Sequence, residues 1–210
     1  MPIFNKTFFE NGFLHKLALA DIWDEDKLHL FLIIETFKMK IAIAGAHRVD
    51  KTTLAEKLLE YFSDYELRPE PYYELEELGH VFSETPNIDD FIEQLEYSIK
   101  QISMSEDKVI FDRCPVDLLA YMQATSESNG IESFYHKVQN VIKEIDLLVF
   151  VPIENPDLIS CPKSELPELR HQVNEILNEW IWDFDIETIE VTGTLSARTN
   201  QVIKKVSQKQ

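Results

Sequence analysis

Nine consecutive residues carry side chains and a spacing suited to holding phosphate groups. They are Gly45, Ala46, His47, Arg48, Val49, Asp50, Lys51, Thr52 and Thr53. The first glycine, the lysine and the first threonine match the pattern G-x-x-x-x-G-K-[ST], between an apolar β-type run and a helical pattern. In such a loop, backbone N–H groups converge on an anion, the lysine neutralises the outer phosphates and the threonine hydroxyl ligates Mg²⁺. The segment therefore predicts a site for ATP or another nucleoside triphosphate with Mg²⁺, rather than a chance turn before a helix.

Asp50 departs from this pattern, because a glycine is expected directly before the lysine. A carboxylate at this position faces phosphate oxygens. Two unit charges ~4 Å apart repel by about 4 kcal/mol at an effective dielectric near 20. Without compensation from Lys51 or Mg²⁺, that repulsion weakens binding by roughly three decades. The loop is thus expected to bind weakly, to bind in an altered pose, or to be inactive.

A second constellation is Asp112-Arg113, which follows the short apolar run 109–111. A carboxylate at the tip of a buried strand beside a phosphate loop is well placed to hold Mg²⁺, directly or through water. The guanidinium next to it could bind a phosphoryl group through two hydrogen bonds. The alternative is a surface ion pair at a strand end, which would contribute little.

Glu70 lies between Pro69 and Pro71, after a possible strand at 65–67. The prolines make this segment stiff, so the direction of the carboxylate is restricted. A carboxylate fixed there could take a proton from a substrate hydroxyl. Taken alone, a solvated loop glutamate explains the residue equally well. Its significance depends on sharing a sheet edge with the other two constellations.

These residues need a scaffold, and the chain alternates strand and helix patterns from Lys40 onwards. Apolar β-type runs lie at 41–44, 65–67, 109–111, 146–151 and 188–191, and helical patterns lie at 52–62, 88–102, 116–124, 131–144 and 168–182. Helices between successive strands are typical of right-handed βαβ units, whose ligands bind at the carboxyl ends of the strands. We therefore expect an α/β fold of three layers, with a mainly parallel sheet of about five strands and helices on both faces.

The composition and the net charge of the chain argue against some classes of function. The chain of 210 residues has 38 acidic and 20 basic residues, a formal charge of −18, which disfavours nucleic-acid binding. No run reaches the roughly 18 apolar residues that a membrane helix needs, so no membrane contact is expected. Cys114 and Cys161 lie far apart, outside any metal-binding spacing. We interpret them as reduced thiols of a cytoplasmic protein.

The compositional break at Met39 divides the chain. Residues 1–38 are rich in aromatic side chains and have no steady period. They form an N-terminal extension of uncertain role, or an upstream start that the natural protein does not use. Residues 39–210 form the predicted nucleotide-binding domain.

At the segments GAHRVDKTTLAEKL, RPEP, IFDRCPVDLLAY and VTGT, the chain resembles the P-loop nucleoside and nucleotide kinases. In particular it is similar to AAA-type ATPase-like proteins related to the nicotinamide riboside kinase domain, and to the deoxynucleoside kinases. The resemblance spans roughly residues 39–210. The chain departs from the family pattern mainly in its phosphate loop, where Asp50 makes the motif degenerate. It implies a P-loop NTPase fold.

The resemblance also implies roles for individual residues. Asp112 would serve catalysis or metal binding, Arg113 would contact phosphate or substrate, and Glu70 would act as the base. A lid at 152–170 would bring cations over the phosphates, and its candidates are Lys163 and Arg170. The glycine turn after the last strand, with Gly193 and Thr194, would lie near the adenine.

Three functions fit these observations. The first is ATP- and Mg²⁺-dependent phosphoryl transfer to a small hydroxyl-bearing acceptor, with a nucleoside-like molecule as one candidate and catalytic roles for Lys51, Asp112, Arg113 and Glu70. Thr52 and Asp112 would hold the metal. The second is a nucleotide-binding regulatory module or pseudo-enzyme, which Asp50 favours. The third is an NTPase coupled to a protein partner, for which residues 1–38 could supply a surface or mediate self-association into a homo-oligomer.

Overall fold

The computed structural model describes residues 38–126, 130–157 and 159–208. The N-terminal extension predicted at 1–38 lies, except for Lys38, outside the described residues. Its role stays a prediction.

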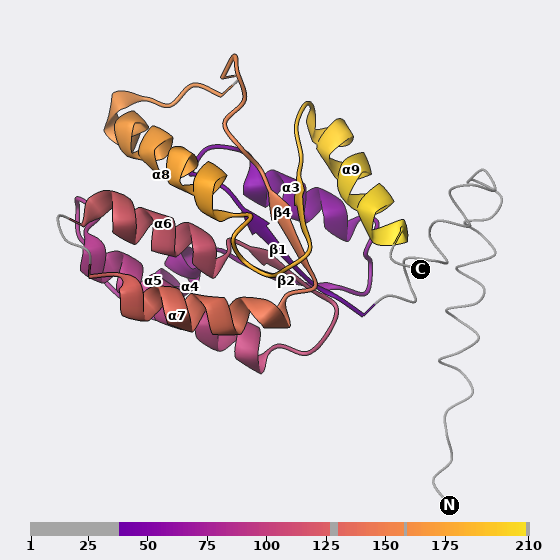
Figure 1. Ribbon diagram of the computed structural model, residues 1–210, viewed down its shortest axis with the longest axis horizontal. Helices are drawn as coiled ribbons and strands as arrows, with labels where there is room; N and C mark the ends of the chain where they lie inside the picture. Colours follow the sequence, from indigo (N-terminus) through magenta and orange to yellow (C-terminus); the bar gives the residue numbers. More distant parts are fainter. Residues whose placement is uncertain (1–37, 127–129, 158, 209–210) are drawn as a thin grey trace, which may run out of the picture.

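Five parallel strands form one sheet in the order β2-β3-β1-β4-β5 (Figure 1). Their bounds are β1 (Lys40–Ala44), β2 (Glu66–Arg68), β3 (Val109–Asp112), β4 (Leu147–Phe150) and β5 (Thr188–Glu190). The three central strands are buried along their whole length, which explains why each reads as a continuous apolar run. The predicted α/β fold with a parallel sheet is confirmed.

Helices connect the strands and cover both faces of the sheet (Figure 1). They are α3 (Lys51–Leu59), α4 (Pro71–Glu77), α5 (Ile88–Met104), α6 (Pro115–Thr125), α7 (Glu132–Val141), α8 (Pro167–Trp180) and α9 (Leu195–Ser207), with short 3₁₀ turns η1 (Ile142–Glu144) and η2 (Lys163–Glu165). The helix α4 follows Glu70 directly. It begins at Pro71, whose missing N–H costs nothing at the first helical position.

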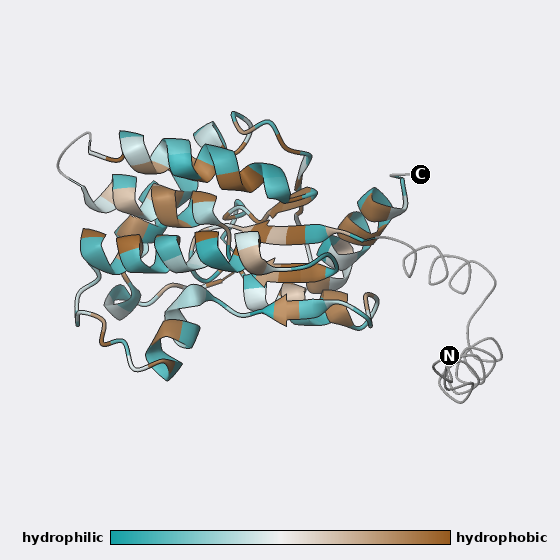
Figure 2. Ribbon diagram, turned by 90° about the horizontal axis from the view of Figure 1, so that it is seen from below, coloured by the Kyte–Doolittle hydropathy of each residue, from teal (hydrophilic) through white to brown (hydrophobic). Residues whose placement is uncertain are grey.

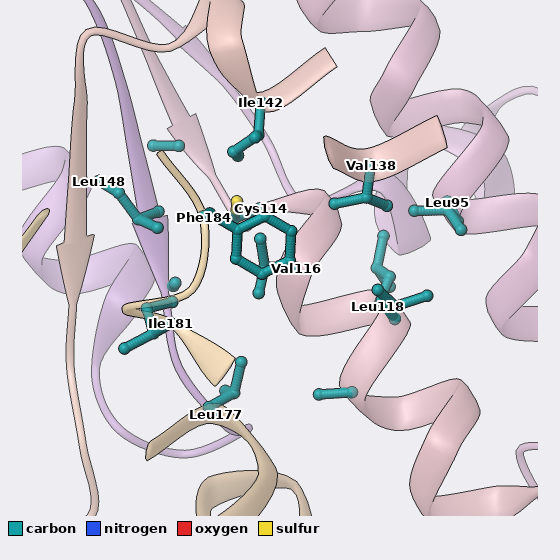
Figure 3. Close-up of a cluster of buried hydrophobic side chains, with 14 of the residues drawn as sticks. Leu95, Cys114, Val116, Leu118, Val138, Ile142, Leu148, Leu177, Ile181 and Phe184 are labelled. Carbon is teal, nitrogen blue, oxygen red and sulfur yellow. The ribbon is translucent and has the colours of Figure 1, made fainter. Parts of the chain in front are cut away.

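Two hydrophobic clusters hold the layers together. On one face, side chains of α5, α6, α7 and α8 pack on alternate residues of the strands, including Ala42, Phe111 and Leu148. Figure 3 shows Leu148 in this cluster with Val116, Leu118 and Leu177. On the other face, α3 and α9 pack on Ile41, Ile43 and their neighbours. Figure 2 shows hydrophobic residues along the strands and on the inward side of the helices. Because side chains alternate along a strand, β1 supplies both cores and is held rigidly between them.

Among the described residues, no helix has the length and apolar character that a bilayer span requires. Both cysteines are free, with Cys114 buried.

Candidate functional site

The phosphate-loop segment connects β1 to α3 at the carboxyl edge of the sheet. Gly45 lies where a Cβ atom would come within 2.4 Å of the Val151 carbonyl oxygen, so only glycine fits. Arg48 and Asp50 both have left-handed backbone conformations, with φ of 54° and 64°. Asp50 thus keeps a conformation that glycine adopts without strain, and aspartate is among the residues that tolerate it best. The departure from the motif therefore changes the side chain at this point and leaves a turn that still leads into α3.

Lys51 is the first residue of α3 and is 5% exposed. Its Nζ donates a hydrogen bond of 2.7 Å to the Ala46 carbonyl, so the side chain folds back across the loop. Burial, and then the charge of Arg113, lowers the pKa of the Lys51 ammonium group. A phosphate would replace these unfavourable surroundings with a negative partner.

Thr52 and Asp112 meet at the position where a metal ion is expected. The Thr52 hydroxyl donates a 2.6 Å hydrogen bond to Asp112 Oδ2, while Asp112 Oδ1 is buried without a partner in the described part of the chain. Burial raises the pKa of the Asp112 carboxyl. An unpartnered carboxylate oxygen beside a hydroxyl suits Mg²⁺, which prefers oxygen ligands. The donor set therefore fits the predicted ion.

Arg113 and Glu70 form an ion pair at the ends of β3 and β2. Arg113 is 6% exposed, and its guanidinium lies 5.3 Å from the centroid of the Tyr121 ring. Burial opposes its charge, but the surrounding acidic groups, Glu70 foremost, together outweigh burial and raise the pKa of Arg113. The guanidinium and the carboxylate thus lie together beside Asp112. The predicted sharing of one sheet edge by Glu70, Asp112 and Arg113 is what the structure shows.

Two residues of α6, Asp117 and Tyr121, support the loop and were missed by sequence reasoning. Asp117 is fully buried, and its Oδ1 accepts a 3.1 Å hydrogen bond from the Gly45 N–H. Burial raises the pKa of Asp117 to about 7. The Tyr121 hydroxyl lies 2.7 Å from both the backbone nitrogen and Nδ1 of His47. An aspartate within the apolar run 116–122 was the available signal, because a buried acid needs a donor.

His47 faces the η2 segment as well as α6. Its Nε2 lies 2.7 Å from the Glu165 carbonyl oxygen, and burial, followed by the charges of Lys51 and Arg113, lowers the pKa of His47 to about 4. The imidazole is therefore neutral at pH 7. No group of three or more histidine, cysteine, aspartate or glutamate side chains suited to a metal ion occurs in the described ranges.

The residues predicted for the lid lie in η2 and α8, and those predicted near the adenine lie between β5 and α9. Arg170, 1% exposed, donates hydrogen bonds of 2.9 Å to the carbonyls of His47 and Arg48. Lys163 is exposed on η2. The Gly193 N–H donates to Glu154 Oε1 at 2.6 Å, and Thr194 caps α9. Roles for these four predicted residues in nucleotide contact stay predictions.

A cavity of about 470 Å³ opens beside the loop. Its lining includes His47, Glu70 and Arg113 from the sheet edge. The opposite wall comes from the following aromatic and polar residues of the α4 to α6 region: Tyr72, Phe82, Ser83, Glu84, Thr85, Pro86, Asp90, Phe91, Gln94 and Tyr121. The volume and the aromatic walls suit a small molecule with a flat ring.

The sheet order, the loop between β1 and α3, and Asp112 at the end of β3 define a P-loop NTPase fold. A family model for an AAA domain, AAA_28, matches residues 40–198, and the chain belongs to that family. The resemblance seen in the sequence is thereby confirmed. No curated protein matches the chain.

Solved structures with this fold include several kinases. Deoxyadenosine kinase from M. mycoides, with products bound, aligns with a TM-score of 0.59 and 17% identity over 82% of this chain and 100% of that one. Thymidylate kinase from Candida albicans aligns with a TM-score of 0.57 and 16% identity over 81% and 92%. NadR protein in complex with NR aligns with a TM-score of 0.61 and 17% identity over 91% of this chain and 58% of NadR. At these identities the likeness establishes the fold.

Proposed function

We propose that the protein transfers the γ-phosphoryl group of ATP, or of another nucleoside triphosphate, to a hydroxyl group of a small nucleoside-like acceptor. The observation that carries the proposal is the ion pair between Glu70 and Arg113, which lines a cavity of about 470 Å³ directly beside the phosphate loop. An acceptor in this cavity would meet a carboxylate and a guanidinium together. Phosphoryl transfer depends mainly on such positioning and charge.

Each residue predicted for catalysis or for the metal ion has a place in this scheme. Lys51 neutralises the outer phosphates, while Thr52 and Asp112 would hold Mg²⁺, which would offset the charge of the phosphates. Arg113 binds the transferring group. Glu70 orients the acceptor hydroxyl and takes its proton.

The wall opposite Glu70 supports a ring-bearing acceptor. Tyr72 and Phe82 stack with centroids 4.5 Å apart, and Phe91 stacks on Tyr121 at 5.0 Å. The Gln94 side chain is buried nearby, and its Nε2 donates to the Asp90 carbonyl at 3.1 Å. Aromatic faces beside one amide provide stacking and hydrogen bonding for a base. The solved kinases include proteins bound to nucleotides or to NR, which is consistent with this class of acceptor.

An assay of phosphoryl transfer tests the proposal. A panel of nucleosides is incubated with Mg-ATP, and ADP release and phosphorylated product are both measured. With an acceptor that reacts, Glu70→Gln is expected to lower kcat about 100-fold or more, because the base is lost. Glu77→Gln, an exposed glutamate of α4, is the matched control and retains the parental rate.

An unchanged kcat in Glu70→Gln would contradict the proposed role of Glu70 as the base. ADP release without product would favour the NTPase alternative. Binding of Mg-ATP without either reaction would favour the regulatory module, for which Asp50 is the supporting observation. Self-association and a cytoplasmic location stay predictions.

A further inference from the structure

The phosphate loop contains two residues other than glycine in the left-handed region of backbone space. These are Arg48 and Asp50, with φ of 54° and 64°. A Cβ atom makes this conformation costly, so such residues persist only where their surroundings hold them. The surroundings of these two residues are specific.

Arg170, in the first turn of α8, holds the peptide groups on both sides of Arg48. Its Nε donates to the His47 carbonyl and its Nη2 to the Arg48 carbonyl, each at 2.9 Å. Its Nη1 is paired with Asp157. The guanidinium is 1% exposed, so these acceptors replace the water it has lost.

Arg198, in the first turn of α9, does the same for Asp50. Its Nη1 donates at 2.8 Å to the Val49 carbonyl, which precedes Asp50, and its Nη2 is bonded to Glu154 at 2.8 Å. The carbonyl of Asp50 itself accepts the Leu54 N–H at 3.0 Å, as the first turn of α3 requires. Both peptide groups around each strained residue are therefore held.

The direction of these contacts matters for binding. In a trans peptide group, the C=O of one residue and the N–H of the next point in opposite directions. Carbonyls of His47, Arg48 and Val49 that turn toward the arginines leave the following three N–H groups turned away from them. Backbone N–H groups aimed together form the anion site of such a loop.

We propose that Arg170 and Arg198 are positioning residues that hold the phosphate loop in its binding conformation, with Arg170 acting on Arg48 and Arg198 acting on Asp50. The assignment deepens the proposed function and rests on it. Asp157 and Glu154 anchor the two arginines, and both acids lie on the segment that follows β4. The hydrogen bonds from the arginines lower the pKa of both acids, so the anchors stay charged at neutral pH.

Because each arginine is assigned to one loop residue, the proposal predicts that a glycine rescues only the variant of its own arginine. A general effect of the arginines on the stability of the fold would not give this selectivity. Arg198→Met and Arg170→Met are each expected to weaken Mg-ATP binding about 30-fold or more, measured by calorimetry, since buried charged hydrogen bonds are lost. Glycine needs no support in the left-handed region. Beyond its effect in the parent, Asp50→Gly should therefore recover about tenfold in Arg198→Met but not in Arg170→Met. Arg48→Gly should do the converse.

The four double-mutant cycles compare matched with crossed pairs, so the intrinsic effect of each glycine cancels. The KM for ATP should rise in the single variants while the KM for the acceptor is retained. The control is Lys205→Met. Lys205 lies on α9, as Arg198 does, and its ion pair with Glu187 is at the surface, so this variant should bind Mg-ATP with the parental affinity. If a methionine variant does not fold, Arg198→Lys and Arg170→Lys replace it with smaller expected losses.

Parental affinity in both arginine variants, or equal coupling in matched and crossed pairs, overturns the assignment. If neither the parent nor Asp50→Gly binds Mg-ATP, the proposed function fails. The same cycles are then read in the melting temperature without ligand. Coupling confined to the matched pairs supports the positioning role, and its absence overturns that role too.

Discussion

Asp50 is the residue at which the predicted phosphate loop departs from its motif. The sequence predicts its repulsion from phosphate, and the structure adds that its side chain is exposed. Exposure brings the effective dielectric toward that of water, where charges ~4 Å apart repel by about 1 kcal/mol. The structure thus favours a weakened loop over an inactive one.

We expect Asp50→Gly to tighten Mg-ATP binding about fivefold, because that repulsion is removed. Calorimetry on the parent and the variant measures the change. Asp50→Asn separates charge from backbone, since asparagine also tolerates the left-handed region. An asparagine variant with parental affinity would assign the effect to the backbone instead of the carboxylate.

Asp117 provides a pH test of the loop's support. Burial raises its pKa to about 7, against about 3.9 in an unfolded chain. Between these values the folded state binds more protons, so its stability falls as pH rises through the window and levels off above it. One such group contributes at most about 1.4 kcal/mol per pH unit.

The measurement is urea unfolding of the parent and of Asp117→Asn from pH 4 to 8. Asparagine retains an oxygen for the Gly45 N–H but does not titrate. The parent's free energy of unfolding relative to the variant should fall across the window. His47 titrates in both proteins, so its opposite contribution cancels. A difference that is constant with pH would show that Asp117 does not titrate there.

At the same scale, sequence reasoning found the residues whose motif defines them and missed those defined by contact. Lys51, Asp112, Arg113 and Glu70 were predicted, and the structure brings them to one edge. Arg198 was not predicted, although its side chain is buried and donates to the Val49 carbonyl. A partner 149 residues away in the sequence leaves no local pattern to detect.

At the scale of elements, β1 and β4 determine how closely the loop can approach the sheet. The Gly45 position leaves no room for a Cβ, which would come within 2.4 Å of the Val151 oxygen and 2.9 Å of Val49 Cγ2. We expect Gly45→Ala to lower the free energy of unfolding by about 3 kcal/mol, because backbone must move to relieve the clash.

Gly79→Ala is the matched control. Gly79 has φ of 91° but nothing within 4 Å of a Cβ, so only backbone strain applies. A cost of about 1 kcal/mol is expected there. Denaturant unfolding of both variants gives the comparison, and equal costs would show that packing against β4 is not the constraint.

The elements themselves were largely predictable, since their apolar periods are strong. The strands at 41–44 and 109–111 and the helix at 88–102 correspond to β1, β3 and α5 with ends shifted by one or two residues. The strand order was not predictable from the sequence. The neighbours of β1 in the sheet are β3 and β4, which are not adjacent to it along the chain, and the connections between these strands cross over. That order places the phosphate loop between Asp112 and the segment after β4.

At the scale of the whole molecule, charge opposes the proposed ligand. The chain's formal charge of −18 repels a nucleoside triphosphate at long range, whereas Lys51 and Arg113 attract it only near the loop. Salt screens the long-range repulsion first, since the Debye length falls from about 30 Å at 0.01 M to about 8 Å at 0.15 M. The association rate constant for Mg-ATP should therefore rise severalfold over this range.

Stopped-flow binding of a fluorescent ATP analogue measures this rate constant. Asp50→Gly is the control, because it changes the charge of the loop by one unit and leaves the remaining field in place. Its rate constant should be higher and should keep the same sign of salt dependence. A rate constant that falls with salt would mean that the positive potential at the loop extends far enough to govern the encounter. The acidic surface would then lie outside the approach path of the nucleotide.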